Sequence, residues 1–133
     1  MTGEDFITLA GKMAAGRGGE AAYRTATSRA YYGAFHIARE LLLELKFDPG
    51  RDHAMIQRAL YRTGNDAAKA ASALLSDLQS DRIKADYKLQ NEKAGSAEFA
   101  SLNVESAHSV LSELNRCRDP IVLDEMRRAL ARM

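Results

Sequence analysis

Apolar residues recur at helical spacing along almost the whole chain. Five segments repeat them at steps of three and four positions, at about residues 4–15, 20–47, 53–63, 67–89 and 98–116. A basic, amphipathic turn or two is expected after Pro120, over residues 121–131. Joined by short connections, these segments predict an all-α fold, an up-and-down antiparallel bundle of five or six helices.

Residues typical of helix ends mark the boundaries of these segments. Thr2, with Asp5 three positions later, forms a capping-box pattern. Asp52 and Asp66 are the expected N-caps of the third and fourth helices. Glycine-rich residues 16–19 and the Asp-Pro-Gly sequence that ends at residue 50 predict turns, and the polar residues 90–96 predict a loop.

Gly33 lies inside the longest apolar segment. A glycine in a helix interior costs about 1 kcal/mol relative to alanine, so its presence there needs a reason. The sequence predicts that a neighbouring helix packs closely against the central helix at this position.

Length and charge narrow the classes of function. The chain has 133 residues, enough for one domain over residues 1–133 with its own core. Its 19 Lys and Arg residues face 18 Asp and Glu, which leaves a net charge of +1. This balance argues against a protein that holds long duplex nucleic acid by bulk electrostatics. Any contact with nucleic acid is therefore expected to be local.

The sequence predicts a cytoplasmic protein without a membrane segment. Its first residues are acidic and lack the apolar region of a signal peptide, and its longest strongly apolar run, Leu41-Leu42-Leu43, is far shorter than the roughly 20 residues of a membrane span. Cys117 is the only cysteine, which excludes an intramolecular disulfide and a cysteine zinc site. His53 and His108 fit no metal-ligand spacing, so we expect neither a metal nor a cofactor.

One face of the central helix gathers three chemically active side chains. Arg29 and His36 are seven positions apart, which is about 20° short of two full turns, so both point the same way about 10 Å apart along the axis. Tyr32 lies between them. A permanent cation, a phenol and an imidazole that titrates near neutral pH suit chemistry at a phosphodiester.

Purely structural interpretations of these residues remain open. His36 would then be a partly buried side chain bonded to a neighbour, and Arg29 would pair with Asp86 or another acid. Tyr31, Tyr32 and Phe35 would be core or interface aromatics. For Arg82 and Asp86, four positions apart, a local ion pair is the alternative. Tyr87 is expected to pack against the central helix.

The segment from Ser28 to Ala38 resembles the signature helix of the HEPN domain family. It reads Ser-Arg-Ala-Tyr-Tyr-Gly-Ala-Phe-His-Ile-Ala, and its Arg, six intervening residues and His match the family's Arg-x(4–6)-His pattern. His53 at the start of the third helix and the Arg-Ile-Lys-Ala-Asp-Tyr stretch at residues 82–87 agree with prokaryotic members. The resemblance covers about residues 20–90.

The resemblance implies a helical bundle that forms a homodimer, with two signature helices facing each other across a cleft. In members that cut RNA without a metal, the Arg and His of both protomers form the active site, which makes Arg29 and His36 the candidate catalytic residues. Other members do not cut RNA and act as partners of a minimal nucleotidyltransferase in toxin–antitoxin modules. The candidate ligand-binding residues are Arg29, Tyr32, His36, Arg82 and Asp86.

The sequence departs from the family pattern at two positions. Active members often carry a polar residue directly after the Arg, where this chain has Ala30. One branch of toxins carries a Tyr two residues after the His, the site that the nucleotidyltransferase modifies, and here that position is Ala38. Modification at that position is therefore impossible in this protein.

Three functions fit these observations. The first is a dimeric HEPN protein that binds nucleotide or RNA, or regulates a minimal nucleotidyltransferase in a toxin–antitoxin-like module. The second is a metal-independent endoribonuclease, a toxin, that uses Arg29 and His36 across the dimer cleft. The third is a non-catalytic oligomeric scaffold.

Overall fold

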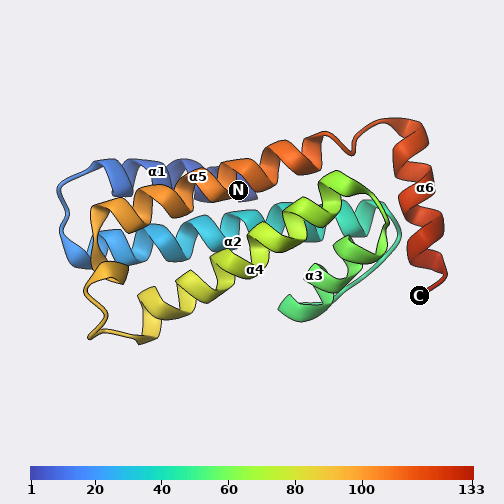
Figure 1. Ribbon diagram of the computed structural model, residues 1–133. Helices are drawn as coiled ribbons and strands as arrows, with labels where there is room; N and C mark the ends of the chain where they lie inside the picture. Colours follow the sequence, from blue (N-terminus) through green and yellow to red (C-terminus); the bar gives the residue numbers. More distant parts are fainter.

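The computed structural model describes residues 1–133 and contains six α-helices and no strand (Figure 1). The helices are α1 (Gly3–Ala15), α2 (Glu20–Glu44), α3 (His53–Arg62), α4 (Asp66–Tyr87), α5 (Ala97–Asn115) and α6 (Pro120–Ala131), with a 3₁₀ turn, η1 (Lys93–Gly95), before α5. The expected all-α bundle is confirmed. None of the helices has the length and apolar character that a membrane span needs.

Side-chain caps start most of the helices. The capping box of Thr2 and Asp5 is present at α1, and Asp52 caps α3 by accepting a hydrogen bond from the backbone N–H of Met55 at 3.0 Å. The expectation for α4 was wrong by one residue. Asn65 is its N-cap, and Asp66 is already the first helical residue.

Two helix ends differ from the sequence-based prediction. The central helix α2 ends at Glu44 rather than near Phe47, because Lys46 takes a positive φ of 64° and the N–H of Phe47 returns to the carbonyl of Leu42 at 2.9 Å. The last helix is longer than predicted, because α6 has 12 residues rather than a turn or two. Asp119 caps it, and Pro120 follows at the position where a missing N–H costs nothing.

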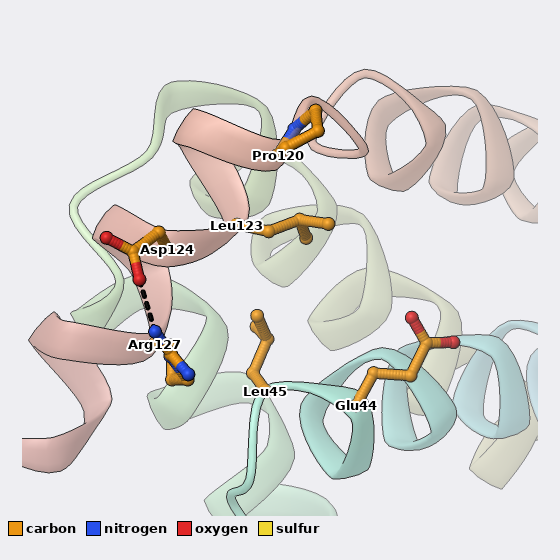
Figure 2. Close-up of a pocket in the computed structure, with 6 residues that line it drawn as sticks. All are labelled: Glu44, Leu45, Pro120, Leu123, Asp124 and Arg127. Atoms are coloured by element: carbon orange, nitrogen blue, oxygen red, sulfur yellow. Dashed lines mark hydrogen bonds and ion pairs between the residues drawn. The ribbon is translucent and has the colours of Figure 1, made fainter.

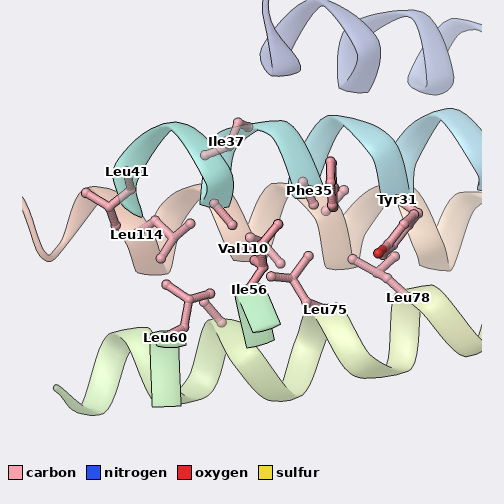
Figure 3. Packing of buried hydrophobic residues seen from close by; sticks show 14 of the residues in the cluster. Tyr31, Phe35, Ile37, Leu41, Ile56, Leu60, Leu75, Leu78, Val110 and Leu114 are labelled. Atoms are coloured by element: carbon pink, nitrogen blue, oxygen red, sulfur yellow. The ribbon is translucent and has the colours of Figure 1, made fainter. Parts of the chain in front are cut away.

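The core forms around α2, which contacts α1, α3, α4 and α5. Figure 3 shows its apolar side chains lying between α2 and the facing helices. The fully buried large side chains include Tyr31 and Leu41 of α2, Leu75 of α4 and Leu114 of α5. In contrast, α6 crosses the end of the bundle (Figure 1). The long central helix is therefore covered on most sides, and its exposed stretches are few.

Helices α1 and α2 are closest where Gly3 faces Gly33. A Cβ added at Gly33 would lie 2.6 Å from Cγ1 of Ile7 and 2.7 Å from the carbonyl oxygen of Gly3, closer than real Cβ contacts allow. The close packing predicted for Gly33 is confirmed. It also brings Phe6 of α1 against the side of α2 that carries Arg29 and His36.

A buried arginine closes the other end of the bundle. Arg24 is only 7% exposed, and its guanidinium donates to five backbone carbonyls at the end of α4 and in the following loop: Lys84, Ala85, Lys88, Leu89 and Asn91. Its Nε donates to Glu20 at 2.9 Å. The carbonyls at a helix C-terminus lack partners within the helix, so this one side chain satisfies the end of α4 and fixes the loop before η1.

Candidate functional site

Arg29, Tyr32 and His36 lie half-buried along one side of α2. The guanidinium carbon of Arg29 lies 5.5 Å from the ring centroid of Phe6 and 5.4 Å from that of Tyr32. Its Nε is buried without a hydrogen-bond partner, and the guanidinium forms no ion pair. Two aromatic faces thus hold this cation by cation–π attraction, while its hydrogen-bond donors are not engaged with an acid.

The imidazole of His36 is packed between two aromatic rings. The ring centroid of Phe6 lies 5.4 Å away and that of Phe35 lies 5.3 Å away, both edge-on. Burial lowers the pKa of His36 below its ordinary value of 6.5, and the nearby cations Arg39 and Arg29 lower it further, against the opposing effect of Glu40. The neutral form of His36 is therefore favoured near pH 7, and it can accept a proton or a hydrogen bond.

His36 borders a cavity of about 340 Å³ beside α2. The lining residues are Tyr32, Phe35, His36, Arg39, Arg51 and His53. Two guanidinium groups and two imidazoles thus surround the space, and no carboxylate does. A second, smaller cavity of about 220 Å³ reaches His36 from the side of Phe6 and the N-terminus. The first cavity has the size and the charge for an anionic ligand such as a nucleotide.

The predicted site residues are only partly brought together within one chain. Tyr32 and His36 line the same cavity, whereas Arg29 does not. The ring of Phe6 packs against both side chains, with its centroid 5.5 Å from the guanidinium carbon of Arg29 and 5.4 Å from the ring centroid of His36. The guanidiniums that line the cavity of His36 in this chain belong to Arg39 and Arg51.

Arg82 and Asp86 form the local ion pair that was the alternative interpretation, with Nη1 and Oδ2 at 3.4 Å. Asp86 also accepts a hydrogen bond from Ser28 at 3.2 Å. It makes no ion pair with Arg29, so the structural interpretation in which Arg29 pairs with Asp86 was wrong. The Arg82 guanidinium packs against the rings of Tyr31 and Tyr32 at 5.6 and 5.4 Å. Neither Arg82 nor Asp86 lines the cavity. Both act behind the site, by joining α4 to α2.

The two remaining aromatic expectations had different outcomes. Tyr31 is a core residue, 1% exposed, and its hydroxyl is hydrogen-bonded to Nδ1 of His53. The expectation that Tyr87 packs against the central helix was wrong, since Tyr87 is 70% exposed at the end of α4. The helix ends there, so the ring has no neighbouring element to cover it.

Three residues that line the cavity were not predicted from the sequence to do so: Arg39, Arg51 and His53. Arg39 carried a usable signal, because it follows His36 by three positions and thus shares its side of the helix. Arg51 and His53 approach α2 only through the path of the connection after residue 44. No pattern local to the sequence specifies that path.

Another cavity, of about 330 Å³, lies between the end of α2 and α6 (Figure 2). It is lined by Glu44, Leu45, Pro120, Leu123, Asp124 and Arg127. Its charged groups are already paired, since Asp124 binds both Arg127 and Arg128, and Glu44 binds Arg118. No group of three His, Cys, Asp or Glu side chains in the structure is placed to hold a metal ion. The cavity at His36 remains the best candidate for a functional site.

Comparison with known proteins identifies the family of the chain. The family model of the HEPN domain matches residues 12–132, which extends the stretch recognised in the sequence to nearly the whole chain. Neither the curated proteins nor the solved structures gave a significant match. HEPN domains commonly dimerise, and the family supports a role connected with nucleotides or RNA. By the extent of this match, the chain belongs to the HEPN domain family.

Proposed function

We propose that this protein is a homodimer that binds RNA or a nucleotide along the side of α2 formed by Arg29, Tyr32 and His36. The observation that carries the proposal is the charge of this surface. Arg29 has no acidic partner, and the adjoining cavity at His36 is lined by Arg39, Arg51 and His53 without a carboxylate. A desolvated guanidinium with free donors is well suited to a phosphate group.

The dimer is part of the proposal because one chain leaves the site divided. Tyr32 and His36 line the cavity and Arg29 does not, so within one subunit the candidate residues are only partly brought together. A second copy of α2 facing the first would supply an additional guanidinium and imidazole across the cleft. Light scattering at micromolar concentration should give about twice the mass of one chain, and a strictly monomeric protein would remove the composite cleft.

Binding is tested with a short single-stranded RNA and with purified variants. Arg29→Ala and His36→Ala should each weaken RNA binding by about tenfold, the effect of losing one charge-assisted contact. Arg58→Ala and His108→Ala are matched controls, because both side chains are exposed and neither lines the cavity. Equal affinity of all four variants would contradict the proposed site. If the unmodified protein binds neither RNA nor a mononucleotide, the non-catalytic oligomeric scaffold is the function that remains.

The regulatory part of the proposal concerns a partner protein. A dimeric HEPN protein of this type is proposed to associate with a small nucleotidyltransferase in a toxin–antitoxin-like module. Co-expression of this chain with a nucleotidyltransferase encoded beside it should give a complex that survives affinity purification and gel filtration. Separate elution of the two proteins would remove the partner and leave RNA or nucleotide binding as the function.

A metal-independent endoribonuclease is the second candidate, because the neutral form of His36 can act as the base that this reaction needs. Because burial lowers its pKa, the neutral imidazole is available to take the proton of a ribose 2′-OH. The 2′ oxygen would then bond to phosphorus while the bond from phosphorus to the 5′ oxygen breaks, and a protonated imidazole would donate its proton to that leaving oxygen. The products would be a 2′,3′-cyclic phosphate and a 5′-hydroxyl end.

Cleavage is tested by incubating single-stranded RNA with the protein in EDTA. A nuclease of this kind should cut RNA in the absence of divalent metal and should lose the activity in both Arg29→Ala and His36→Ala. Intact RNA after incubation with the unmodified protein would remove this candidate. Ala30 weighs toward binding, since the polar neighbour that active members often carry after the Arg is missing and position 30 is buried.

A further inference from the structure

The cavity at His36 has a second wall that the signature helix does not provide. Arg51 and His53 come from the connection after α2 and from the start of α3, and they face Tyr32, Phe35 and His36 across the cavity. Phe35 itself is buried and packs against His53, with ring centroids 4.6 Å apart and ring planes tilted by 30°. The hydrogen-bond donors of this wall therefore lie beside an apolar floor, where a contact to a ligand is stronger than in open water.

The two arginines of the cavity differ in how they are held. Nε of Arg39 donates to the carbonyl of Gly50 at 2.7 Å, which ties the connection to α2. The exposed Asp48 is 4.0 Å from its Nη2 and is itself bonded to the N–H of Gly50. Arg51 is exposed and makes no hydrogen bond or ion pair within the chain. One guanidinium is thus fixed, and the other is free to close on a ligand.

The tautomer of His53 is set by Tyr31. The Tyr31 hydroxyl is buried, and Nδ1 of His53 is its hydrogen-bond partner. Burial raises the pKa of Tyr31, so the hydroxyl keeps its proton and needs an acceptor. Burial, with the neighbouring Arg82, lowers the pKa of His53 against the opposing effect of Asp52, which favours the neutral ring. If Nδ1 accepts from Tyr31, the ring proton is on Nε2, and Nε2–H is the donor left for the cavity.

We propose that Arg39, Arg51 and the Nε2–H of His53 form a subsite for a terminal phosphate group, the phosphomonoester of a mononucleotide or of an RNA end. This inference rests on the proposed function and deepens it. A phosphomonoester carries a charge of about −1.5 to −2 at pH 7 and matches two guanidinium groups, whereas an internal phosphodiester carries a single charge. Of the acids of this connection, Asp52 accepts from the N–H of Met55, and Asp48 accepts from the N–H of Gly50 and is within 4.0 Å of Arg39. Arg51 is the guanidinium of the subsite without an acidic partner.

The first experiment compares ligands that differ only in a terminal phosphate. One RNA sequence is prepared with a 5′-hydroxyl, with a 5′-phosphate and with a 3′-phosphate, and AMP is compared with adenosine by calorimetry. We expect at least one phosphorylated end to bind about tenfold or more tightly than the hydroxyl end, and AMP to bind more tightly than adenosine. The 5′ and 3′ arms show which end of RNA the subsite takes.

Variants then show which residues produce the preference for a phosphorylated end. Arg51→Gln should reduce it by about tenfold, whereas Arg58→Gln, the same change at an exposed position of α3 outside the cavity, should preserve it. Tyr31→Phe removes the hydroxyl that occupies Nδ1. It should shift the imidazole ¹⁵N resonances of His53 toward a mixture of tautomers and reduce the preference by a smaller factor.

The outcomes separate this subsite from the function on which it rests. Equal binding of phosphorylated and hydroxyl RNA overturns the subsite and leaves RNA binding in place. A preference that survives in Arg51→Gln overturns the assignment of these residues. Failure of the unmodified protein to bind any of the RNAs or AMP overturns both proposals.

Discussion

Two arginines on α2 are held in opposite ways. Arg24 is buried, and backbone carbonyls and Glu20 take up its donors. Arg29 lies between the rings of Phe6 and Tyr32, with an Nε that has no acceptor. A cation whose donors are all used serves the fold. A cation packed against aromatic faces keeps its donors unpaired, and this difference separates the structural end of α2 from the side proposed to bind a ligand.

The largest expected effect is at Arg24. Replacing Arg24 with Met leaves the carbonyls at the end of α4 without their donor, so we expect the free energy of unfolding to fall by about 3 kcal/mol or more. Arg29→Met is the matched control. It removes cation–π contacts but also a buried, unsatisfied Nε, and should cost about 1 kcal/mol or less. Urea denaturation measures both, and equal losses would contradict the distinction between the two arginines.

The second largest expected effect is at Gly33, where α1 packs closely on α2 and brings Phe6 against Arg29. Gly33→Ala places a Cβ 2.6 Å from Ile7 and should cost about 1–3 kcal/mol through overpacking between α1 and α2. The displaced α1 should also change the NMR environment of His36. Gly11→Ala is the control, because its Cβ would meet Val104 at an ordinary 3.8 Å and alanine favours a helix. A loss of stability in Gly11→Ala as large as in Gly33→Ala would show that packing at Gly33 is not special.

Removing the ring of Phe6, which packs against both Arg29 and His36, tests the proposed binding side of α2 directly. Phe6→Ala should raise the pKa of His36 toward its ordinary value, because burial is the main cause of the lowered value. NMR titration of the imidazole measures this shift. Phe6→Leu restores much of the covering volume and should restore most of the lowering. A pKa of His36 that does not respond to Phe6→Ala would mean that other neighbours bury the imidazole.

The smallest expected effect is the dependence of stability on pH. His36 and His53 both have a pKa lowered by burial in the folded protein, so the unfolded chain binds more protons below pH 6.5. Stability is then complete above pH 6.5 and should decline as the pH falls through the folded pKa values. His36→Gln and His53→Gln should each flatten this decline. An unchanged slope in both variants would contradict the burial of the imidazoles.

Much of the fold could be predicted because its signals are local. The capping box at Thr2, the cap at Asp52 and the turn at Gly16–Gly19 follow from residues within a few positions of each other. The difference between Asn65 and Asp66 as N-cap is one that local preference does not resolve, since both side chains cap well. The start of α6 has a local signal too, because Asp119 is a good N-cap and Pro120 suits the first position of a helix.

The candidate site could be predicted only where a single helix provides it. Arg29, Tyr32 and His36 share one side of α2 because of helical geometry, and the structure agrees with that spacing. Two features depend on how α1 and the connection after α2 pack against this helix: Phe6 contacts both Arg29 and His36, and Arg51 and His53 line the cavity. Such contacts between distant segments leave no periodic signal in the sequence.

Phe6 lies before residue 12, where the match to the family model begins, yet its ring touches both Arg29 and His36. A substitution at this one position would change how much solvent reaches the imidazole while every residue of the signature stayed the same. Two proteins with identical signature helices could therefore differ in reactivity through their leading helix alone.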